Sequence, residues 1–367
     1  MRRGSRPAWA RSARDLARYK PSRMGANPPQ GERDRELCKC SEKDFERVEE
    51  RDPTQADQGV EADMKVFKSG AFADRVLSLY KRGLPPGCST GWPSVDRCYT
   101  VAAGEFSIVT GIPNHGKSTW LDALLVNLLG QECNGKPWRF FVCSPEQQPT
   151  ELHIAELLEK HIGKRFRDGP GPRMRQDEMT DAVMAVMDAR FEFAELEHED
   201  EFADVLTAAH AFAKRCADLG YQPGIVLDPW NRLEHRRPTH QSETEYISDA
   251  LTCTVSLCRD TGAHMWLVAH PRQLQADRNT GQRPVPTAYD ISGSAHFANK
   301  ADNIIVIWRD MAAAHQGLPT ALETTVYVQK VRRRHIGKVG NMRLKYDLQS
   351  GRYLDVIESY VERGINA

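Results

Sequence analysis

The sequence predicts an α/β fold in which a mostly parallel β-sheet carries helices on both faces. From about residue 88 onward, short apolar runs alternate with segments of helical period, which is the pattern of consecutive strand–helix units. One strand-to-helix junction carries a glycine-rich loop at residues 111–118. In folds of this kind, ligands bind at the carboxyl edge of the sheet.

The elements follow in order along the chain. The predicted strands are the apolar runs 106–110, 139–143, 224–227, 264–269, 303–308 and 325–329. The predicted helices have apolar residues at three- and four-residue spacing, at 117–129, 150–161, 177–188, 202–218 and 243–260. The segment 166–174 contains Gly-Pro-Gly-Pro and is predicted to be a loop. The acidic run 195–201 is interpreted as a solvated face.

The first 65 residues lack apolar periodicity and are predicted to be a disordered basic arm and linker. Residues 1–23 carry eight Arg and Lys side chains against Asp15 alone. Three interpretations of this arm stay open: a solvated tail, a contact to nucleic acid, and an organellar targeting segment.

A linker helix is predicted within residues 66–87, because Phe72, Val76, Leu77 and Tyr80 fall at helical spacing. The helix is either the first helix of the core or one that packs on a neighbouring subunit. The catalytic domain is predicted at 88–357 and a short tail at 358–367.

The composition is that of a soluble globular protein: 40% of the 367 residues are apolar, 27% are charged, and the formal net charge is zero. No run approaches the ~18–20 apolar residues of a membrane span, so no membrane partner is predicted. The nine cysteines are scattered, and the close pair Cys38 and Cys40 lacks the second pair or histidines of a zinc site. Free thiols in a reducing compartment are predicted.

Residues 111–118 read G-I-P-N-H-G-K-S, the spacing of a phosphate-binding loop. Gly111 and Gly116 allow the backbone to curl so that its N–H groups face phosphate oxygens. Lys117 is placed to reach the β- and γ-phosphates, and Ser118 to hold Mg²⁺. ATP and Mg²⁺ are therefore the predicted cofactors. The residues predicted to bind the nucleotide are Gly111, Ile112, Pro113, Asn114, His115, Gly116, Lys117, Ser118, Thr119 and Asp228.

Two acidic residues follow other predicted strands. Asp228 ends the apolar run 224–227, where a carboxylate orients Mg²⁺ through its water; a plain strand-end aspartate is the alternative. Glu146 follows the strand 139–143 and is either the base that positions the attacking water or an acid that caps the next helix.

Polar residues also follow two more strands. His270 ends the strand 264–269 and either touches the γ-phosphate or is satisfied by a backbone carbonyl. Lys330 and Arg332 belong to a basic cluster after 325–329. Such a cluster is either solvated, or faces nucleic acid, or enters a neighbouring subunit's site to stabilise transition-state charge.

Taken in order, these segments resemble the ring-forming replicative helicases of superfamily 4. The resemblance is closest to the Twinkle and phage T7-type primase-helicases and more distant to DnaB-type helicases, and it covers roughly residues 70–355. It rests on the stretches 91–96 (G-W-P-S-V-D), 144–146 (S-P-E), 228–235 (D-P-W-N-R-L-E-H), 242–246 (S-E-T-E-Y), 268–271 (V-A-H-P) and 289–297 (Y-D-I-S-G-S-A-H-F).

The resemblance implies a RecA-like P-loop NTPase core and a role for each site residue. Glu146 becomes the catalytic base, Asp228 the acid that orients Mg²⁺, and His270 the γ-phosphate sensor. Lys330 and Arg332 match finger residues that act in trans. The segments after His270 and at 293–300 match loops that line the central channel, where the DNA-binding candidates are Arg272, Gln273, Asn299 and Lys300.

The predicted function is that of an ATP-dependent replicative DNA helicase, which forms a hexameric ring on single-stranded DNA at a fork and moves 5′ to 3′. The alternative is a single-stranded-DNA-binding ATPase that does not unwind, such as a RecA-like loader or filament module. A small-molecule kinase would leave Glu146, Lys330 and Arg332 without a purpose. About 65 residues stand where relatives carry a primase region, so a separate primase is an expected partner. The predicted location is the cytoplasm of a bacterial or phage-infected cell, with a mitochondrion or plastid as the alternative.

Overall fold

The computed structural model describes residues 67–197, 200–277, 283–291, 293, 295–311, 313 and 316–356. The predicted basic arm, the tail at 358–367 and the pair Cys38 and Cys40 lie outside the described residues. None of the described helices combines the length and the apolar composition that crossing a bilayer requires.

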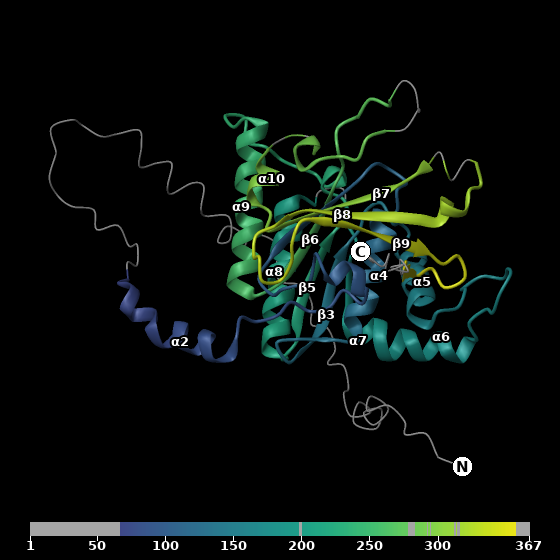
Figure 1. The fold of residues 1–367 in the computed structure, drawn as a ribbon, viewed down its shortest axis with the longest axis horizontal. Helices are drawn as coiled ribbons and strands as arrows, with labels where there is room; N and C mark the ends of the chain where they lie inside the picture. Colours follow the sequence, from purple (N-terminus) through teal and green to yellow (C-terminus); the bar gives the residue numbers. More distant parts are fainter. Residues whose placement is uncertain are drawn as a thin grey trace, which may run out of the picture. The chain divides into compact units, whose positions relative to one another are not determined.

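A single mixed sheet forms the centre of the fold (Figure 1). Its six parallel strands run in the order β4 (Phe191–Ala194), β3 (Lys136–Cys143), β5 (Gln222–Leu227), β6 (His264–Ala269), β1 (Phe106–Thr110) and β7 (Asn303–Arg309). The sheet continues antiparallel through β8 (Glu323–Val331), β9 (Gly340–Tyr346) and β10 (Tyr353–Asp355), while β2 (Glu132–Cys133) pairs antiparallel with the start of β3. The predicted α/β fold with a mostly parallel sheet is confirmed.

Helices cover both faces of the sheet. One buried cluster includes side chains of α4 (Lys117–Leu129), α5 (Thr150–Ile162) and α6 (Gln176–Ala182), and a second includes side chains of α8 (Phe202–Asp218), α9 (Glu243–Thr261) and α10 (His296–Lys300). Strand β1 serves both clusters, because Val109 belongs to the first and Ile108 to the second. All five β1 residues are therefore buried, as in the central strand of a parallel sheet.

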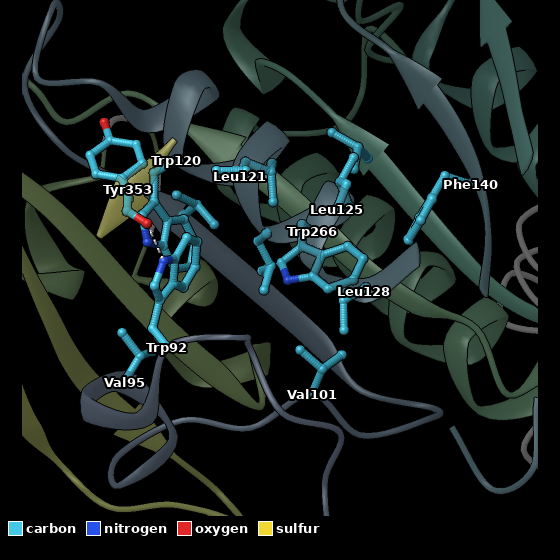
Figure 2. Packing of buried hydrophobic residues seen from close by; sticks show 14 of the residues in the cluster. Trp92, Val95, Val101, Trp120, Leu121, Leu125, Leu128, Phe140, Trp266 and Tyr353 are labelled. Carbon is cyan, nitrogen blue, oxygen red and sulfur yellow. Dashed lines mark hydrogen bonds between the residues drawn. The ribbon is translucent and has the colours of Figure 1, made fainter. Parts of the chain in front are cut away.

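Aromatic side chains pack the segment that precedes β1 against helix α4, which follows β1 (Figure 2). Trp92 stacks on Trp120 of α4 with ring centroids 5.9 Å apart. Its indole N–H donates to the carbonyl of Tyr353, at 2.8 Å, so β10 is fixed against the same helix. The other described elements include the short helices α3 (Pro93–Asp96) and α7 (Asp188–Arg190) and the single turns at Ser69–Phe72, Trp230–Arg232, Ala288–Asp290 and Pro319–Leu322.

The structure differs from the prediction in several elements. The helix predicted at 177–188 consists of α6, a π-helical turn at Val183–Met187 and α7. Strands β2, β4, β9 and β10 and helix α10 were not predicted. The segment 166–174 has neither helix nor strand, as expected.

Helix α2 (Ala73–Arg82) forms where the linker helix was predicted, but none of its residues is buried. Val76, Leu77 and Tyr80 are 61%, 49% and 86% exposed. Interpreting this segment as the first core helix is therefore wrong for the part of the chain that the structure describes. Packing on a neighbouring subunit stays a prediction.

Candidate nucleotide-binding site

The phosphate loop lies between β1 and α4, as the sequence predicts. Gly116 adopts a left-handed conformation, with φ at 86°, which favours glycine. Gly111 is also restricted, because a Cβ there would collide with the carbonyl oxygen of Ile307 on the neighbouring strand. The 13-residue helix α4 begins at Lys117, so the backbone N–H groups of its first turn are available to an anion.

The Lys117 side chain lies inside this loop. It is 6% exposed, and its ammonium donates to the carbonyl of Ile112 at 3.2 Å. Burial lowers the pKa of Lys117, while the nearby carboxylates of Asp228 and Glu146 act in the opposite direction. A partly desolvated cation in a loop of backbone donors is suited to polyphosphate.

Asp228 follows β5 at the same edge of the sheet and is 2% exposed. Its Oδ1 atom is buried without a hydrogen-bond partner. Burial raises the pKa of Asp228 to about 6, and a hydrogen bond with Ser118 offsets part of this rise. An unpartnered carboxylate oxygen beside a serine hydroxyl fits a hard divalent cation such as Mg²⁺. The two residues predicted to hold the metal are thus neighbours.

Glu146 projects from the loop that follows β3. Its Oε1 lies 3.3 Å from Nε of Arg232, and its Oε2 lies 3.6 Å from Nε2 of His270. Glu146 does not cap α5, because that helix begins at Thr150 after an N-cap at Pro149. The predicted base therefore contacts two groups from the ends of other strands.

The register of the strands explains why these groups meet. Cys143 pairs with Leu227, Leu227 with Leu267, and Ala269 with Thr110. The residues that follow these strands consequently share one edge. His270 is held there by its backbone N–H, which donates to Oδ1 of Asn231 at 2.9 Å. Burial lowers the pKa of His270, and the charges of Lys117 and Arg232 lower it further against the opposing effect of Glu146, so the ring is neutral at neutral pH.

Three polar partners in this site were missed by sequence reasoning. Arg232 and Asn231 belong to the stretch 228–235, and Gln147 follows Glu146 directly. Their position in the sequence could have identified them, because each lies within four residues of Glu146 or Asp228, the carboxylates that follow predicted strands.

Lys330 and Arg332 lie at the opposite edge of the sheet from the phosphate loop. Strand β8 runs antiparallel, so Val331 pairs with Asn303 at the start of β7, whereas Thr110 pairs with Val306 further along. Lys330 donates to the carbonyl of Ala298 at 2.7 Å, and Arg332 pairs with Asp302 at 3.1 Å. Neither side chain is placed to serve the phosphate loop of its own chain.

The predicted DNA-binding residues follow β6 or belong to α10. Arg272 is 68% exposed and pairs with Asp290 at 2.9 Å. The Lys300 ammonium donates to Oγ of Ser248 on α9 at 2.9 Å, and Gln273 and Asn299 are exposed. Contact of these four residues with DNA stays a prediction.

Replacing Asp228 by Asn is expected to stabilise the nucleotide-free protein while abolishing Mg²⁺-dependent ATP hydrolysis. The pKa of Asp228 is raised from 3.8 to about 6, so the stability associated with its neutral form is present below pH 3.8 and is lost as the pH rises through 6. Removing the buried charge should increase the free energy of unfolding by about 3 kcal/mol at pH 7.5.

Thermal unfolding at pH 7.5 and pH 5 measures this effect. The gain in the melting temperature should shrink at pH 5, and the exposed control Asp181→Asn should show none. A gain that grows as the pH falls would contradict the assignment of the buried charge.

Part of this chain matches a known family, and most of it is similar to a known protein. Residues 97–276 match a family described as an AAA domain. The Twinkle homolog protein, chloroplastic/mitochondrial, of Arabidopsis thaliana is 37% identical over 297 residues, which are 79% of this chain and 40% of that protein. The chain thus spans about two fifths of the length of this relative.

Solved structures share the fold. One that is described as an ATPase domain aligns with a TM-score of 0.61 at 16% identity, covering 79% of this chain and 100% of that one. A DnaB-like replicative helicase, studied with its interactions with primase, aligns with a TM-score of 0.60 at 16% identity, covering 77% of this chain and 67% of that one. The predicted RecA-like core is confirmed.

Proposed function

We propose that the chain carries an ATPase domain of the superfamily 4 replicative helicases, the group of the Twinkle and DnaB-type proteins, and that it is an ATP-dependent DNA helicase; its similarity to these proteins supports the proposal. The observation that carries the proposal is the meeting of Lys117, Asp228, Glu146 and His270 at one edge of the sheet, beside a loop built for phosphate. Hydrolysis at this site would drive movement along single-stranded DNA and separation of the duplex ahead.

Each residue has a distinct part in the proposed hydrolysis. Ser118 and Asp228 would hold Mg²⁺, which neutralises charge on the phosphates when bound. Lys117 would bind the β- and γ-phosphates from within the loop, and Glu146 would orient the attacking water and accept its proton. The ring of His270 lies 3.6 Å from Glu146 at the edge of the sheet that carries the phosphate loop, and it would contact the γ-phosphate and respond to its loss.

The placement of the basic residues supports the proposal of a ring. Lys330 and Arg332 lie at the edge opposite to the phosphate loop, so they would stabilise transition-state charge only at the site of a neighbouring subunit. The apolar residues Val76, Leu77 and Tyr80 of α2 are exposed in this chain, and burial against a second copy would remove them from water. Both features support a closed ring, and a hexamer is the form proposed.

Partners and location follow from the same proposal. Arg272, Gln273, Asn299 and Lys300 would line the channel for single-stranded DNA. The DnaB-like structure is described with its interactions with primase, which supports a separate primase as a partner here. The plant relative is named as a chloroplast and mitochondrial protein, which favours the organellar alternative over the cytoplasm.

A forked DNA duplex tests the proposal. The wild-type protein with ATP and Mg²⁺ is expected to release the labelled strand, whereas Lys117→Ala, which removes the phosphate-binding ammonium, should release none. Substrates with a single 5′ or 3′ tail then measure the polarity, and the 5′-tailed substrate should be the one that loads. Wild-type protein that hydrolyses ATP with single-stranded DNA yet never separates strands would support the alternative, a non-unwinding DNA-binding ATPase.

A further inference from the structure

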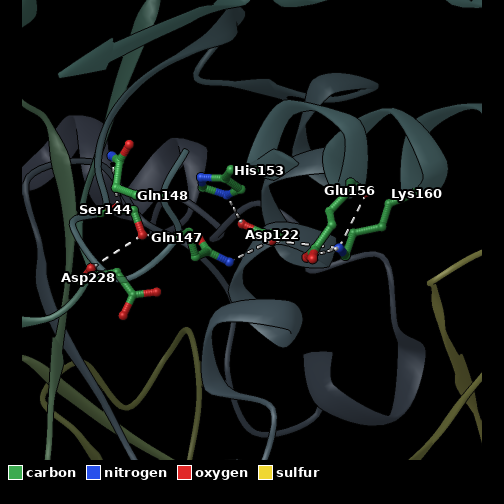
Figure 3. A network of polar contacts seen from close by, with 8 residues as sticks. All are labelled: Asp122, Ser144, Gln147, Gln148, His153, Glu156, Lys160 and Asp228. Atoms are coloured by element: carbon green, nitrogen blue, oxygen red, sulfur yellow. Dashed lines mark hydrogen bonds and ion pairs between the residues drawn. The ribbon is translucent and has the colours of Figure 1, made fainter. Parts of the chain in front are cut away.

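A buried ionic cluster lies between α4 and α5 and is not used by the proposed hydrolysis (Figure 3). The carboxylate of Asp122 pairs with Nε2 of His153 at 2.9 Å and with Nζ of Lys160 at 3.6 Å. The three residues are 4%, 4% and 2% exposed. Charged side chains this deeply buried are uncommon in a core and are retained where they are paired.

Interactions within the cluster favour the charged forms of Asp122 and His153. Burial alone would raise the pKa of Asp122, but the charges of His153 and Lys160, together with hydrogen bonds from His153 and Gln147, outweigh burial and lower that pKa. Burial alone would likewise lower the pKa of His153, and the Asp122 carboxylate outweighs it and raises that pKa. The Glu156 carboxylate lies 3.8 Å from Lys160, and the Phe193 ring packs on His153. The centre of this arrangement is therefore a fixed negative charge on α4.

Gln147 connects this charge to the loop that carries Glu146. Its Nε2 lies 3.5 Å from Oδ2 of Asp122, and its Oε1 accepts from the hydroxyl of Ser144 at 3.0 Å. The same hydroxyl lies 3.2 Å from the carbonyl oxygen of Asp228. The Gln147 side chain thus connects the phosphate-loop helix to the end of β3, and the Ser144 hydroxyl continues the link to the residue that follows β5.

We propose that Gln147 is a positioning residue for Glu146, anchored by the Asp122–His153–Lys160 cluster. The proposal rests on the proposed role of Glu146 as the base. Asp122 lies four residues after Ser118, one turn along the face of α4 that begins at the phosphate loop. The link therefore sets the base relative to the helix that holds the phosphates, and an error of about 1 Å in such a distance is enough to slow a reaction about 100-fold.

The substitution Gln147→Leu tests this link because it keeps the volume of the side chain and removes both of its polar contacts. The kcat of DNA-stimulated ATP hydrolysis should fall about 10- to 100-fold. The KM for ATP and the Kd for a fluorescent ATP analogue should stay within about twofold of the wild-type values. The melting temperature should stay within a few degrees of that of the wild type. The matched control Gln148→Leu, at the exposed neighbouring glutamine, should hydrolyse ATP as the wild type does. Wild-type kcat in Gln147→Leu would overturn the proposal.

A double-mutant cycle separates positioning from an independent effect. In the background of Glu146→Gln, Gln147→Leu should cause no further loss of kcat, because its effect passes through the base. If the kcat of the double variant falls below that of Glu146→Gln by the factor that Gln147→Leu causes alone, the proposal is wrong. Asp122→Asn, which keeps the shape and removes the charge, should lower kcat in the same direction and add nothing to Gln147→Leu. If Glu146→Gln hydrolyses ATP at the wild-type rate, the proposed role of Glu146 as the base is wrong. If Glu146→Gln is inactive but Gln147→Leu hydrolyses ATP at the wild-type rate, only the positioning role of Gln147 is wrong.

Discussion

The substitution Glu146→Gln should lower the kcat of ATP hydrolysis about 1000-fold while ATP still binds. Removing a positioned general base costs roughly 10²- to 10⁴-fold, and the amide keeps the shape of the side chain. Lys117, Ser118 and Asp228 remain in place to bind the nucleotide, so the Kd for a fluorescent ATP analogue should change little. Steady-state hydrolysis with single-stranded DNA and equilibrium titration measure the two quantities on the same preparation.

The contacts of Glu146 sharpen this expectation. Arg232 and His270 both lie against its carboxylate, and glutamine retains an oxygen to accept from Arg232. The folded protein should therefore tolerate the change, with a melting temperature close to that of the wild type. Glu151→Gln, an exposed acid in the first turn of α5, is the matched control and should remain active. Hydrolysis at the wild-type rate by Glu146→Gln would remove Glu146 from the mechanism.

The elements nearest the site were the most predictable from the sequence. Strand β1 and helix α4 have the predicted bounds, because a continuous apolar run ends at a glycine that the phosphate loop requires. The bounds of β6 and α8 also agree with the prediction. These segments are central or strongly amphipathic, so their burial pattern and their local sequence lead to the same structure.

The edge of the sheet was less predictable. In β9 the buried residues Met342 and Leu344 alternate with exposed polar side chains, which is a strand pattern that sequence reasoning overlooked. Strand β4 has four residues and follows α7 directly, with no glycine or proline between them. The π-helical turn at Val183–Met187 interrupts a segment whose sequence has a continuous helical pattern.

The residues of the site also divide into those that the sequence predicts and those that it does not. Glu146, Asp228 and His270 were predictable because each follows a predicted strand, and residues at the carboxyl ends of parallel strands meet at one edge of the sheet. Arg232 is 86 residues from Glu146 in the chain, and its contact depends on the turn that follows Asp228. The buried Asp122–His153 pair joins two helices, and no spacing within either helix predicts the partner on the other.

The substitution Arg332→Ala should lower ATP hydrolysis by the assembled protein about 1000-fold, the scale of removing an arginine finger. The reason is geometric: Arg332 lies at the edge of the sheet opposite to the phosphate loop and would reach only a neighbour's site. Because Arg332 also pairs with the buried Asp302, Arg332→Lys is a second variant that retains a charge for Asp302 but not the planar fork that stabilises phosphate. Arg332→Lys should fold as the wild type does, but its rate of ATP hydrolysis should stay far below that of the wild type. The exposed neighbour Arg334→Ala is the control that should stay active.

Mixing two inactive variants tests the trans arrangement directly. In a ring, each site combines the Glu146 of one subunit with the Arg332 of the next. An equal mixture of Glu146→Gln and Arg332→Ala then forms intact sites at about a quarter of the interfaces, those in which the Arg332→Ala subunit supplies the base and its neighbour the finger. Hydrolysis should rise well above the sum of the separate variants, toward a quarter of the wild-type rate. If Arg332 served its own chain, every site in the mixture would lack one group, and no rise would occur.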